Sequence, residues 1–237
     1  MVEALSRRTQ RDGDINPFGT HCLTATNGQV REAFSRDDQT EEGPMAEMNR
    51  ISRFFVNRSS ARRNTRIYEW IRVNLSLPAG ATCLEIGCGS GDMAARLVDG
   101  FRPTRYVATD LDPRQLDAAR EALARRYPNG LPVALELRAA DMLALPFPDA
   151  SFDAVFAFVT IHHASPKHRD FANVPRALSE IDRVLKPMGF LVYEEIEHKE
   201  NIRRWLLDHG LTLSGVQRNW KRESVVAKKR GPAPSIR

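Results

Sequence analysis

At 237 residues and a formal net charge of +5, the chain is long enough for one domain of ordinary size plus an extension. No run of about 18 apolar residues occurs, and no apolar segment follows the arginines near the start, so we expect neither a membrane span nor a secretory signal and a cytoplasmic location. The three cysteines, Cys22, Cys83 and Cys88, form no CxxC or Cys/His spacing, which predicts reduced thiols and no zinc site.

Charge is unevenly distributed along the chain. Residues 1–48 are acidic on balance and rich in turn residues, so we expect a polar N-terminal extension without a core of its own. Residues 50–66 contain six arginines and no acidic residue. Such a cluster is typical of a solvated helix face, and a patch for an anionic substrate or nucleic acid is the alternative.

Apolar residues recur at helical spacing within and after this arginine cluster. They are Ile51, Phe54 and Phe55 within it, and Ile67, Trp70, Ile71 and Leu75 after it. The spacing predicts two amphipathic helices within residues 49–76. These helices lead into a domain expected over residues 77–230, and residues 231–237 form a basic tail.

The most informative stretch follows, and it reads Leu-Glu-Ile-Gly-Cys-Gly-Ser-Gly-Asp from position 84 to position 92. A buried strand over 82–86, a glycine turn and a helix from Met93 form the first half of a βαβ unit. The three glycines let the backbone turn sharply and let a ligand come close. A dinucleotide fingerprint needs glycine at position 92, where this chain has Asp92, so NAD is not favoured.

The rest of the chain alternates strands and helices. We expect strands over 106–109, 133–139, 154–159, 190–196, 211–220 and 224–228, with helices over 113–123, 174–185 and 202–210. Asp110 ends the second strand, where a carboxylate can accept both hydroxyls of a ribose. Asp112 and Pro113 predict the start of the next helix, so Asp110 is not needed as its cap.

The motif Leu84–Gly91 resembles the first motif of the class I S-adenosylmethionine-dependent methyltransferases. The segments 145–153 and 177–187 resemble later parts of the same family, and the resemblance covers about residues 75–230. It implies an α/β fold: a doubly wound, mostly parallel sheet of seven strands with helices on both faces, the last strand antiparallel, and an N-terminal helical extension. Met188 departs from the family pattern, because a second glycine is usual there.

This resemblance also implies a cofactor, S-adenosyl-L-methionine, bound at the carboxyl ends of the strands. The cofactor-binding residues that it implies are Glu85, Gly87, Gly89, Asp110, Leu111, Asp141, Met142 and Val159. In the family, an acid at the position of Asp110 holds the ribose and one at the position of Asp141 bonds the adenine amino group. Asp153 matches a family motif but lies at the entry of its strand, so we expect a structural role for it.

Candidates for catalysis begin at Thr160, where the substrate-facing residues of the family start, and they are His162, His163 and Glu194. A histidine pKa near 6.5 suits removal of a proton from a hydroxyl or an amine. A surface or capping role for either histidine stays open, and Glu195 could also contribute a carboxylate. Without a third ligand at a recognisable spacing, the two histidines predict no metal site.

The expected activity is methyl transfer to a small organic acceptor, with O-, N- and C-methylation all open. The chain lacks both the Asn/Asp-Pro-Pro-aromatic tetrapeptide and the Pro-Cys pair of enzymes that methylate nucleic-acid bases, so a nucleic-acid partner is not favoured. Two alternatives remain: a catalytically silent cofactor-binding interaction module, and a methyltransferase acting on RNA or protein. In the family, helices before the first strand commonly close over the substrate, which makes residues 49–76 a candidate lid.

Overall fold

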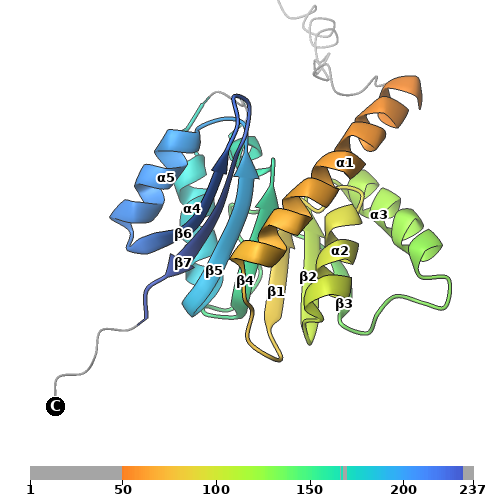
Figure 1. Ribbon diagram of the computed structural model, residues 1–237, viewed down its shortest axis with the longest axis horizontal. Helices are drawn as coiled ribbons and strands as arrows, with labels where there is room; N and C mark the ends of the chain where they lie inside the picture. Colours follow the sequence, from red (N-terminus) through yellow and green to blue (C-terminus); the bar gives the residue numbers. More distant parts are fainter. Residues whose placement is uncertain (1–49, 166, 168–169, 232–237) are drawn as a thin grey trace, which may run out of the picture. The chain divides into compact units, whose positions relative to one another are not determined.

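The computed structural model describes residues 50–165, 167 and 170–231, and these residues build one seven-stranded sheet flanked by helices (Figure 1). The strands are β1 (Thr82–Ile86), β2 (Arg105–Asp110), β3 (Leu135–Ala139), β4 (Phe152–Phe158), β5 (Leu185–Glu195), β6 (Leu211–Arg218) and β7 (Glu223–Lys229). The helices are α1 (Arg50–Asn74), α2 (Asp92–Phe101), α3 (Pro113–Arg126), the 3-10 helix η1 (Ile161–Ala164), α4 (Val174–Val184) and α5 (Lys199–Asp208).

The strand order is β3-β2-β1-β4-β5-β7-β6. Strands β1 to β5 pair in parallel, and β7 pairs antiparallel with both β5 and β6. This arrangement confirms the predicted doubly wound sheet of seven strands and its antiparallel last strand. The order reverses between β1 and β4, so the crevice expected for a ligand lies at the carboxyl ends of those strands.

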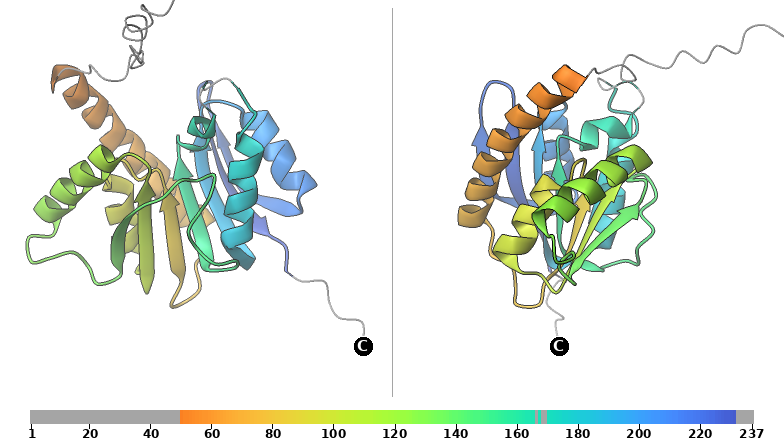
Figure 2. Two further views of the ribbon diagram at one scale, coloured as in Figure 1. Left: turned by 180° about the vertical axis from the view of Figure 1, so that it is seen from behind. Right: turned by 90° about the vertical axis from the view of Figure 1, so that its right-hand side faces the viewer.

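Helices cover both faces of the sheet, with α1, α2 and α3 on one side and α4 and α5 on the other (Figure 2). Alternation along β1 sends Leu84 and Ile86 into the core under α4 and α5, and Cys83 into the core under α1 and α2. Both cores are continuous apolar clusters. The sheet between them is therefore packed on both faces.

The lead-in segment forms one helix of 25 residues, α1, so the prediction of two helices within residues 49–76 was wrong. Neither proline nor glycine interrupts the segment between Ile51 and Leu75, and nothing else there breaks a helix. Ile67, Ile71 and Leu75 are buried as their spacing predicts. The predicted extension over 1–48 and the tail from residue 232 onward lie outside the described residues.

Most strands differ by one or two residues at an end from their predicted bounds, and β5 differs most. Strand β3 begins only at Leu135, because the Leu135 amide donates to the Pro132 carbonyl and closes a turn there. Val133 is therefore fully exposed instead of lying in the strand. Strand β5 begins earlier than predicted, at Leu185, which pairs with Phe152 before a register shift. Met188 adopts a left-handed conformation (φ 66°), which explains why glycine is usual at this position.

Residues 140–151 connect β3 to β4 without a helix. Arg183 of α4 holds this segment by donating from Nη1 to the Phe147 carbonyl (2.8 Å) and from Nη2 to the Leu145 carbonyl (2.9 Å). Its Nη1 also reaches Asp149 Oδ1 at 2.8 Å. Arg183 thus fixes the backbone of a segment whose side chains Leu145 and Phe147 are buried in the core.

At the amino ends of the central strands, Asp153 joins three of them. Its Oδ2 accepts hydrogen bonds from the Thr82 amide (2.8 Å) and the Thr82 hydroxyl (2.9 Å), and it lies 2.8 Å from Lys186 Nζ. This Asp153 clamp of Thr82, Asp153 and Lys186 ties β1, β4 and β5 together. The structural role expected for Asp153 is confirmed.

Among the described helices, none has the length and apolarity needed to cross a bilayer.

Candidate functional site

The glycine loop follows β1, and its three glycines all have left-handed φ values, 66° at Gly87, 51° at Gly89 and 74° at Gly91. A Cβ on Gly87 would lie 2.1 Å from the Thr160 hydroxyl oxygen, which no neighbouring side chain could tolerate. A Cβ on Gly89 would meet nothing within 4 Å. Gly87 therefore lets the loop pack against the end of β4, whereas Gly89 leaves open space above the loop.

The carboxylate of Asp110 closes the other side of this loop. Its Oδ2 accepts the Gly89 amide at 3.0 Å, and its Oδ1 accepts the Asp112 amide at 3.0 Å. Asp112 caps α3 by accepting the Arg114 amide (2.9 Å), as predicted. Next to Asp110, the side chain of Leu111 is 68% exposed. The edge thus presents a fixed carboxylate beside an uncovered apolar surface.

Asp141 and Met142 lie at the end of the next strand, β3. Register pairing places Asp110 opposite Ala139, and the Ala140 amide donates to the Asp110 carbonyl at 3.2 Å. Asp141 Oδ1 accepts the Leu143 amide (2.8 Å), and both Asp141 and Met142 are half-buried. The structure therefore brings these two residues to the same edge as Asp110.

Glu85 lies below the loop instead of at its rim. Its side chain is 2% exposed, and its Oε2 accepts the Tyr106 hydroxyl at 2.8 Å. Burial raises the pKa of the Glu85 carboxyl to about 8, and the bond from Tyr106 opposes part of that increase. Glu85 is therefore mostly protonated at neutral pH and supports the loop from inside.

Val159 ends β4 with a left-handed φ of 57°, and its amide donates to the Glu194 carbonyl at 2.6 Å. This turn directs the chain into η1, which carries both candidate histidines. Because the β4 and β5 ends are bonded at this point, η1 is fixed relative to β5. Val159 lies at the edge that the glycine loop also occupies, since Thr160 contacts Gly87.

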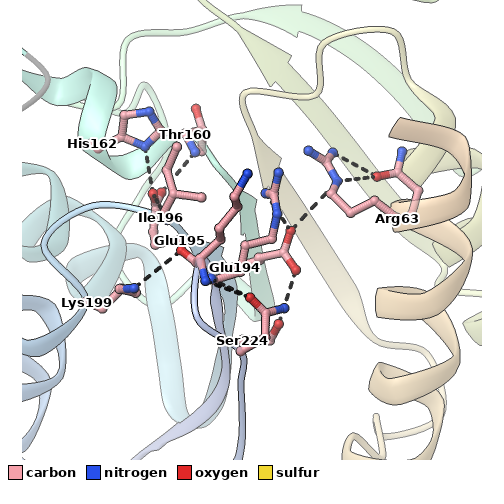
Figure 3. A network of polar contacts seen from close by, with 12 residues as sticks. Arg63, Thr160, His162, Glu194, Glu195, Ile196, Lys199 and Ser224 are labelled. Carbon is pink, nitrogen blue, oxygen red and sulfur yellow. Dashed lines mark hydrogen bonds and ion pairs between the residues drawn. The ribbon is translucent and has the colours of Figure 1, made fainter. Parts of the chain in front are cut away.

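His162 is buried in a network built on Glu195 (Figure 3). The Nδ1 atom of His162 lies 2.6 Å from Glu195 Oε2, while Glu195 Oε1 accepts the amides of Thr160 (2.9 Å) and Ile161 (2.6 Å). Glu195 itself is completely buried. A carboxylate beside Nδ1 favours the tautomer of the imidazole that carries its proton on Nδ1.

Glu194 points to the other face of β5, as strand alternation requires. Its Oε1 lies 3.2 Å from Arg222 Nη1 and 3.7 Å from Arg63 Nε, and its Oε2 accepts the Ser224 hydroxyl at 3.3 Å. His163 is exposed, and its ring centre lies 4.1 Å from that of His162. The three predicted catalytic residues thus fall into two groups: the histidines on one side of β5 and Glu194 on the other.

Sequence reasoning did not select Arg63 or Arg222, and it weighed Glu195 without choosing it. Arg63 was one of six arginines in a cluster interpreted as a solvated face, and nothing local distinguishes it. The sequence does show that Glu194 and Glu195 are neighbours at the end of a strand. Because side chains alternate along a strand, these two must point to opposite faces of the sheet, and only one of them can meet a given histidine. Which of the two meets a histidine depends on the path of η1.

The residues at the ends of β1 and β2 fit a cofactor that contains adenosine. The open space over Gly89, the fixed carboxylate of Asp110 and the exposed Leu111 surface together suit a ribose and a flat base at the strand ends. Among residues 50–165, 167 and 170–231, no group of three or more His, Cys, Asp or Glu side chains is arranged to hold a metal ion.

Residues 84–193 match a family model described as "Methyltransferase domain". The chain is 35% identical over 126 residues to a fatty-acid O-methyltransferase of Mycolicibacterium smegmatis, a match that covers 53% of this chain and 41% of the relative. It is 37% identical over 124 residues to a 2-phytyl-1,4-naphtoquinone methyltransferase of Nostoc punctiforme, which covers 52% of this chain and 50% of the relative. The chain thus spans about half the length of these curated relatives.

Solved structures share the fold at lower identity. A putative sarcosine dimethylglycine methyltransferase from Galdieria sulphuraria superposes with a TM-score of 0.60 and 16% identity, covering 75% of this chain and 88% of that one. The [4+2]-cyclase SpnF gives a TM-score of 0.59 and 18% identity, covering 70% and 81%. These likenesses establish the architecture alone, because one fold supports different reactions.

Proposed function

This chain carries a class I S-adenosylmethionine-dependent methyltransferase domain, and from that premise we propose that it transfers a methyl group from S-adenosyl-L-methionine to a small organic acceptor. The observation that carries the proposal is the carboxylate of Asp110, bonded to the amides of Gly89 and Asp112 at the carboxyl edge of the sheet. The curated relatives act on a fatty acid and on a naphthoquinone, which favours a small and largely apolar acceptor.

The residues at the ends of β1, β2 and β3 would hold the cofactor. Asp110 would accept hydrogen bonds from the ribose hydroxyls, and Leu111 would lie against the adenine. Asp141 and Met142 would bind the adenine as well, and Gly89 would leave the ligand room above the loop. Val159 contributes through its backbone, and Glu85 holds the strand below the loop. When bound, the cofactor supplies a methyl group already activated by its sulfonium.

The residues at the ends of β4 and β5 would act on the acceptor. Glu195 fixes the imidazole of His162 so that Nε2 can accept a proton from a hydroxyl or an amine of the acceptor. His162 is therefore a better candidate for the base than Glu194, whose carboxylate is occupied by two arginines. Orientation of the acceptor lowers the activation barrier of the transfer, since alignment of two reactants can reduce that barrier by roughly 7 to 11 kcal/mol.

The test combines binding and turnover. Purified protein is titrated with S-adenosylmethionine and S-adenosylhomocysteine by calorimetry, and radiolabelled cofactor is then incubated with fatty acids, naphthoquinols and a metabolite extract. We expect label in an organic-soluble product. Cofactor binding without transfer to any acceptor would support a binding module instead, and the absence of cofactor binding would refute the proposed function.

Asp110→Ala provides the matching variant, with Asp112→Ala as its control. A hydrogen bond to a charged group contributes roughly 1.5 to 3 kcal/mol, so Asp110→Ala should weaken binding of both cofactor forms by about ten- to a hundredfold. Asp112→Ala removes a neighbouring carboxylate while keeping its own amide bond to Asp110. It should leave cofactor affinity nearly unchanged, and equal affinity of both variants and the wild type would remove Asp110 from the site.

A further inference from the structure

Two arginines from distant parts of the chain approach the same carboxylate oxygen at the active edge of the sheet. Arg63 comes from α1 and is directed toward Glu194 (Figure 3). Its Nε lies 3.7 Å from Glu194 Oε1, and Nη1 of Arg222, in the turn between β6 and β7, lies 3.2 Å from the same oxygen. We call Arg63 and Arg222 the guanidinium pair. We propose that this pair binds the carboxylate of an acidic acceptor, an inference that rests on the proposed function.

Charge balance provides the first argument. Two guanidinium groups face one carboxylate, which leaves one positive charge unbalanced. The side chains are largely buried: Arg63 is 23% exposed, Arg222 is 28% exposed and Glu194 is 7% exposed. The nearby carboxylate of Asp92 is itself paired with Arg96 at 2.9 Å. Burial lowers the pKa of Arg63, Glu194 opposes this, and Arg222 lowers it further. A partly buried cation pair of this kind is stabilised by a second anion.

The arginine donors provide the second argument. Arg63 uses Nε and Nη2 to bond Asn64 Oδ1, at 3.0 Å and 2.8 Å, and Arg222 uses Nη1 on Glu194. Among the described residues, Nη1 of Arg63 and both Nε and Nη2 of Arg222 make no hydrogen bond to protein. Guanidinium donors in such a fork match the two oxygens of a carboxylate.

Both arginines are held in place by neighbours. Asn219 Oδ1 accepts the amides of Lys221 (2.9 Å) and Arg222 (2.8 Å), which fixes the turn that carries Arg222. Asn64 Nδ2 donates to Asp92 Oδ2 at 2.9 Å, and Asp92 is the first residue of α2, directly after the glycine loop. Arg63 is therefore linked through Asn64 to Asp92, the first residue after that loop.

The position of the pair favours the acceptor over the cofactor as the source of the carboxylate. The proposed cofactor residues stand at the ends of β1, β2 and β3, whereas Glu194 stands at the end of β5, next to Ser224 of β7. Glu195, the next residue, holds His162 on the opposite face of β5. An acceptor anchored by its carboxylate at the guanidinium pair would therefore have to span the carboxyl end of β5 to reach the candidate base.

The test measures binding by calorimetry to protein saturated with S-adenosylhomocysteine. The probes are octanoate, dodecanoate and cinnamate, each compared with its neutral primary amide. We expect at least one acid to bind at least about tenfold more tightly than its amide. Arg222→Gln should weaken acid binding by about ten- to a hundredfold while leaving the amide and S-adenosylhomocysteine unchanged. Arg63→Gln should act in the same way.

Arg218→Gln is the matched control, because Arg218 lies on the same hairpin but pairs with Glu223 at 2.6 Å. It should change none of these affinities. Binding of no acid by the wild type, or equal binding of acids and amides, overturns the proposal. Weakened S-adenosylhomocysteine binding in Arg222→Gln with unchanged acid binding would assign the pair to the cofactor and also overturn it. Cofactor binding by the wild type keeps these failures separate from a failure of the proposed function.

Discussion

Glu195 binds His162 with one carboxylate oxygen and the backbone of η1 with the other. Oε2 lies 2.6 Å from Nδ1 of the imidazole, and Oε1 accepts the amides of Thr160 and Ile161. The same carboxylate therefore sets both the position of η1 and the tautomer of its buried histidine. This double use makes the effects of substituting Glu195 and His162 distinguishable.

If His162 is the base, His162→Ala should lower turnover about a hundredfold or more while cofactor affinity stays nearly the same. Glu195→Gln keeps an oxygen for the two amides but directs an NH₂ group at Nδ1, which favours the tautomer with the proton on Nε2. We expect a smaller loss of turnover and an altered acid limb of the pH profile. Steady-state kinetics from pH 5.5 to 9 measure both effects.

His163→Ala is the comparison for that experiment, because His163 is adjacent and exposed. A loss confined to His163→Ala would transfer the role of base to that residue. Unchanged turnover in both histidine variants would leave methyl transfer to positioning alone.

Gly87→Ala and Gly89→Ala should separate the packing function of the loop from its ligand-binding function. The Cβ at Gly87 collides with Thr160, so we expect a loss of about 2 to 4 kcal/mol in the free energy of unfolding. The Cβ at Gly89 meets no protein atom, so the loss should be only about 1 to 2 kcal/mol, from the left-handed backbone. Cofactor binding should nevertheless be severely weakened in Gly89→Ala.

Urea unfolding and calorimetry of both glycine variants give the two quantities. Wild-type cofactor affinity in Gly89→Ala would show that no ligand occupies the space above this glycine. Equal stability of the two variants would contradict the contact between Gly87 and Thr160.

Glu85→Gln should change how stability depends on pH. The folded-state pKa of about 8 lies above the ordinary value of 4.5, so the folded chain holds a proton that the unfolded chain releases between those values. Stability from this group is therefore greatest below about pH 4.5 and falls until about pH 8, by at most ~5 kcal/mol. The glutamine side chain of the variant does not titrate, so this component of the slope should vanish.

Urea unfolding of wild type and Glu85→Gln at pH 5.5, 7 and 8.5 tests this expectation through the difference between the two proteins. The variant should gain stability relative to the wild type as the pH rises. A difference that is constant across the three pH values would show that Glu85 titrates normally.

Nucleic-acid binding should lack the steep salt dependence that six phosphate contacts would give, a log-log slope of about −4 to −5. Arg63 of the arginine cluster lies 3.7 Å from Glu194 and is only 23% exposed, so it adds little to an exposed arginine surface. We expect the remaining arginines to pair with the acidic residues at positions 37–47, which lie outside the described residues. Filter binding of RNA and DNA at low and moderate salt measures the slope.

Tight, salt-sensitive retention that disappears in the Arg62→Ala, Arg66→Ala double variant would favour nucleic acid as the substrate. Both arginines are exposed, so their loss should not disturb the fold. Unaltered weak retention in the double variant would agree with a small acceptor.

The sequence was sufficient for the fold because its signals were local. The glycine loop, the cap at Asp112 and the alternation of strands and helices each follow from neighbouring residues, and the structure confirms them. The pattern predicts two helices instead of the single helix α1 because the apolar spacing stops at Val56 and resumes at Ile67, although the arginines between them favour a helix. Apolar spacing therefore marked the buried residues Ile67, Ile71 and Leu75, but not that the helix continues through the arginine-rich stretch.

The contacts of the site could not be predicted in the same way, because they join residues far apart in the chain. The meeting of Arg63 with Arg222 depends on the angle at which α1 crosses the sheet and on the β6–β7 turn. The choice of Glu195 over Glu194 as the partner of His162 depends on the left-handed turn at Val159. Neither determinant leaves a local pattern of residue types.

The Asp153 clamp lies at the amino ends of β1, β4 and β5, whereas the glycine loop and the histidines lie at their carboxyl ends. Substitutions at the amino ends of the strands should consequently change thermal stability, and substitutions at their carboxyl ends should change the choice of acceptor. Laboratory evolution toward new acceptors can diversify the turn that carries Arg222 and the residues of η1 while the clamp is left intact. A strengthened clamp gives such libraries more tolerance of destabilising substitutions, because most new specificities lower stability.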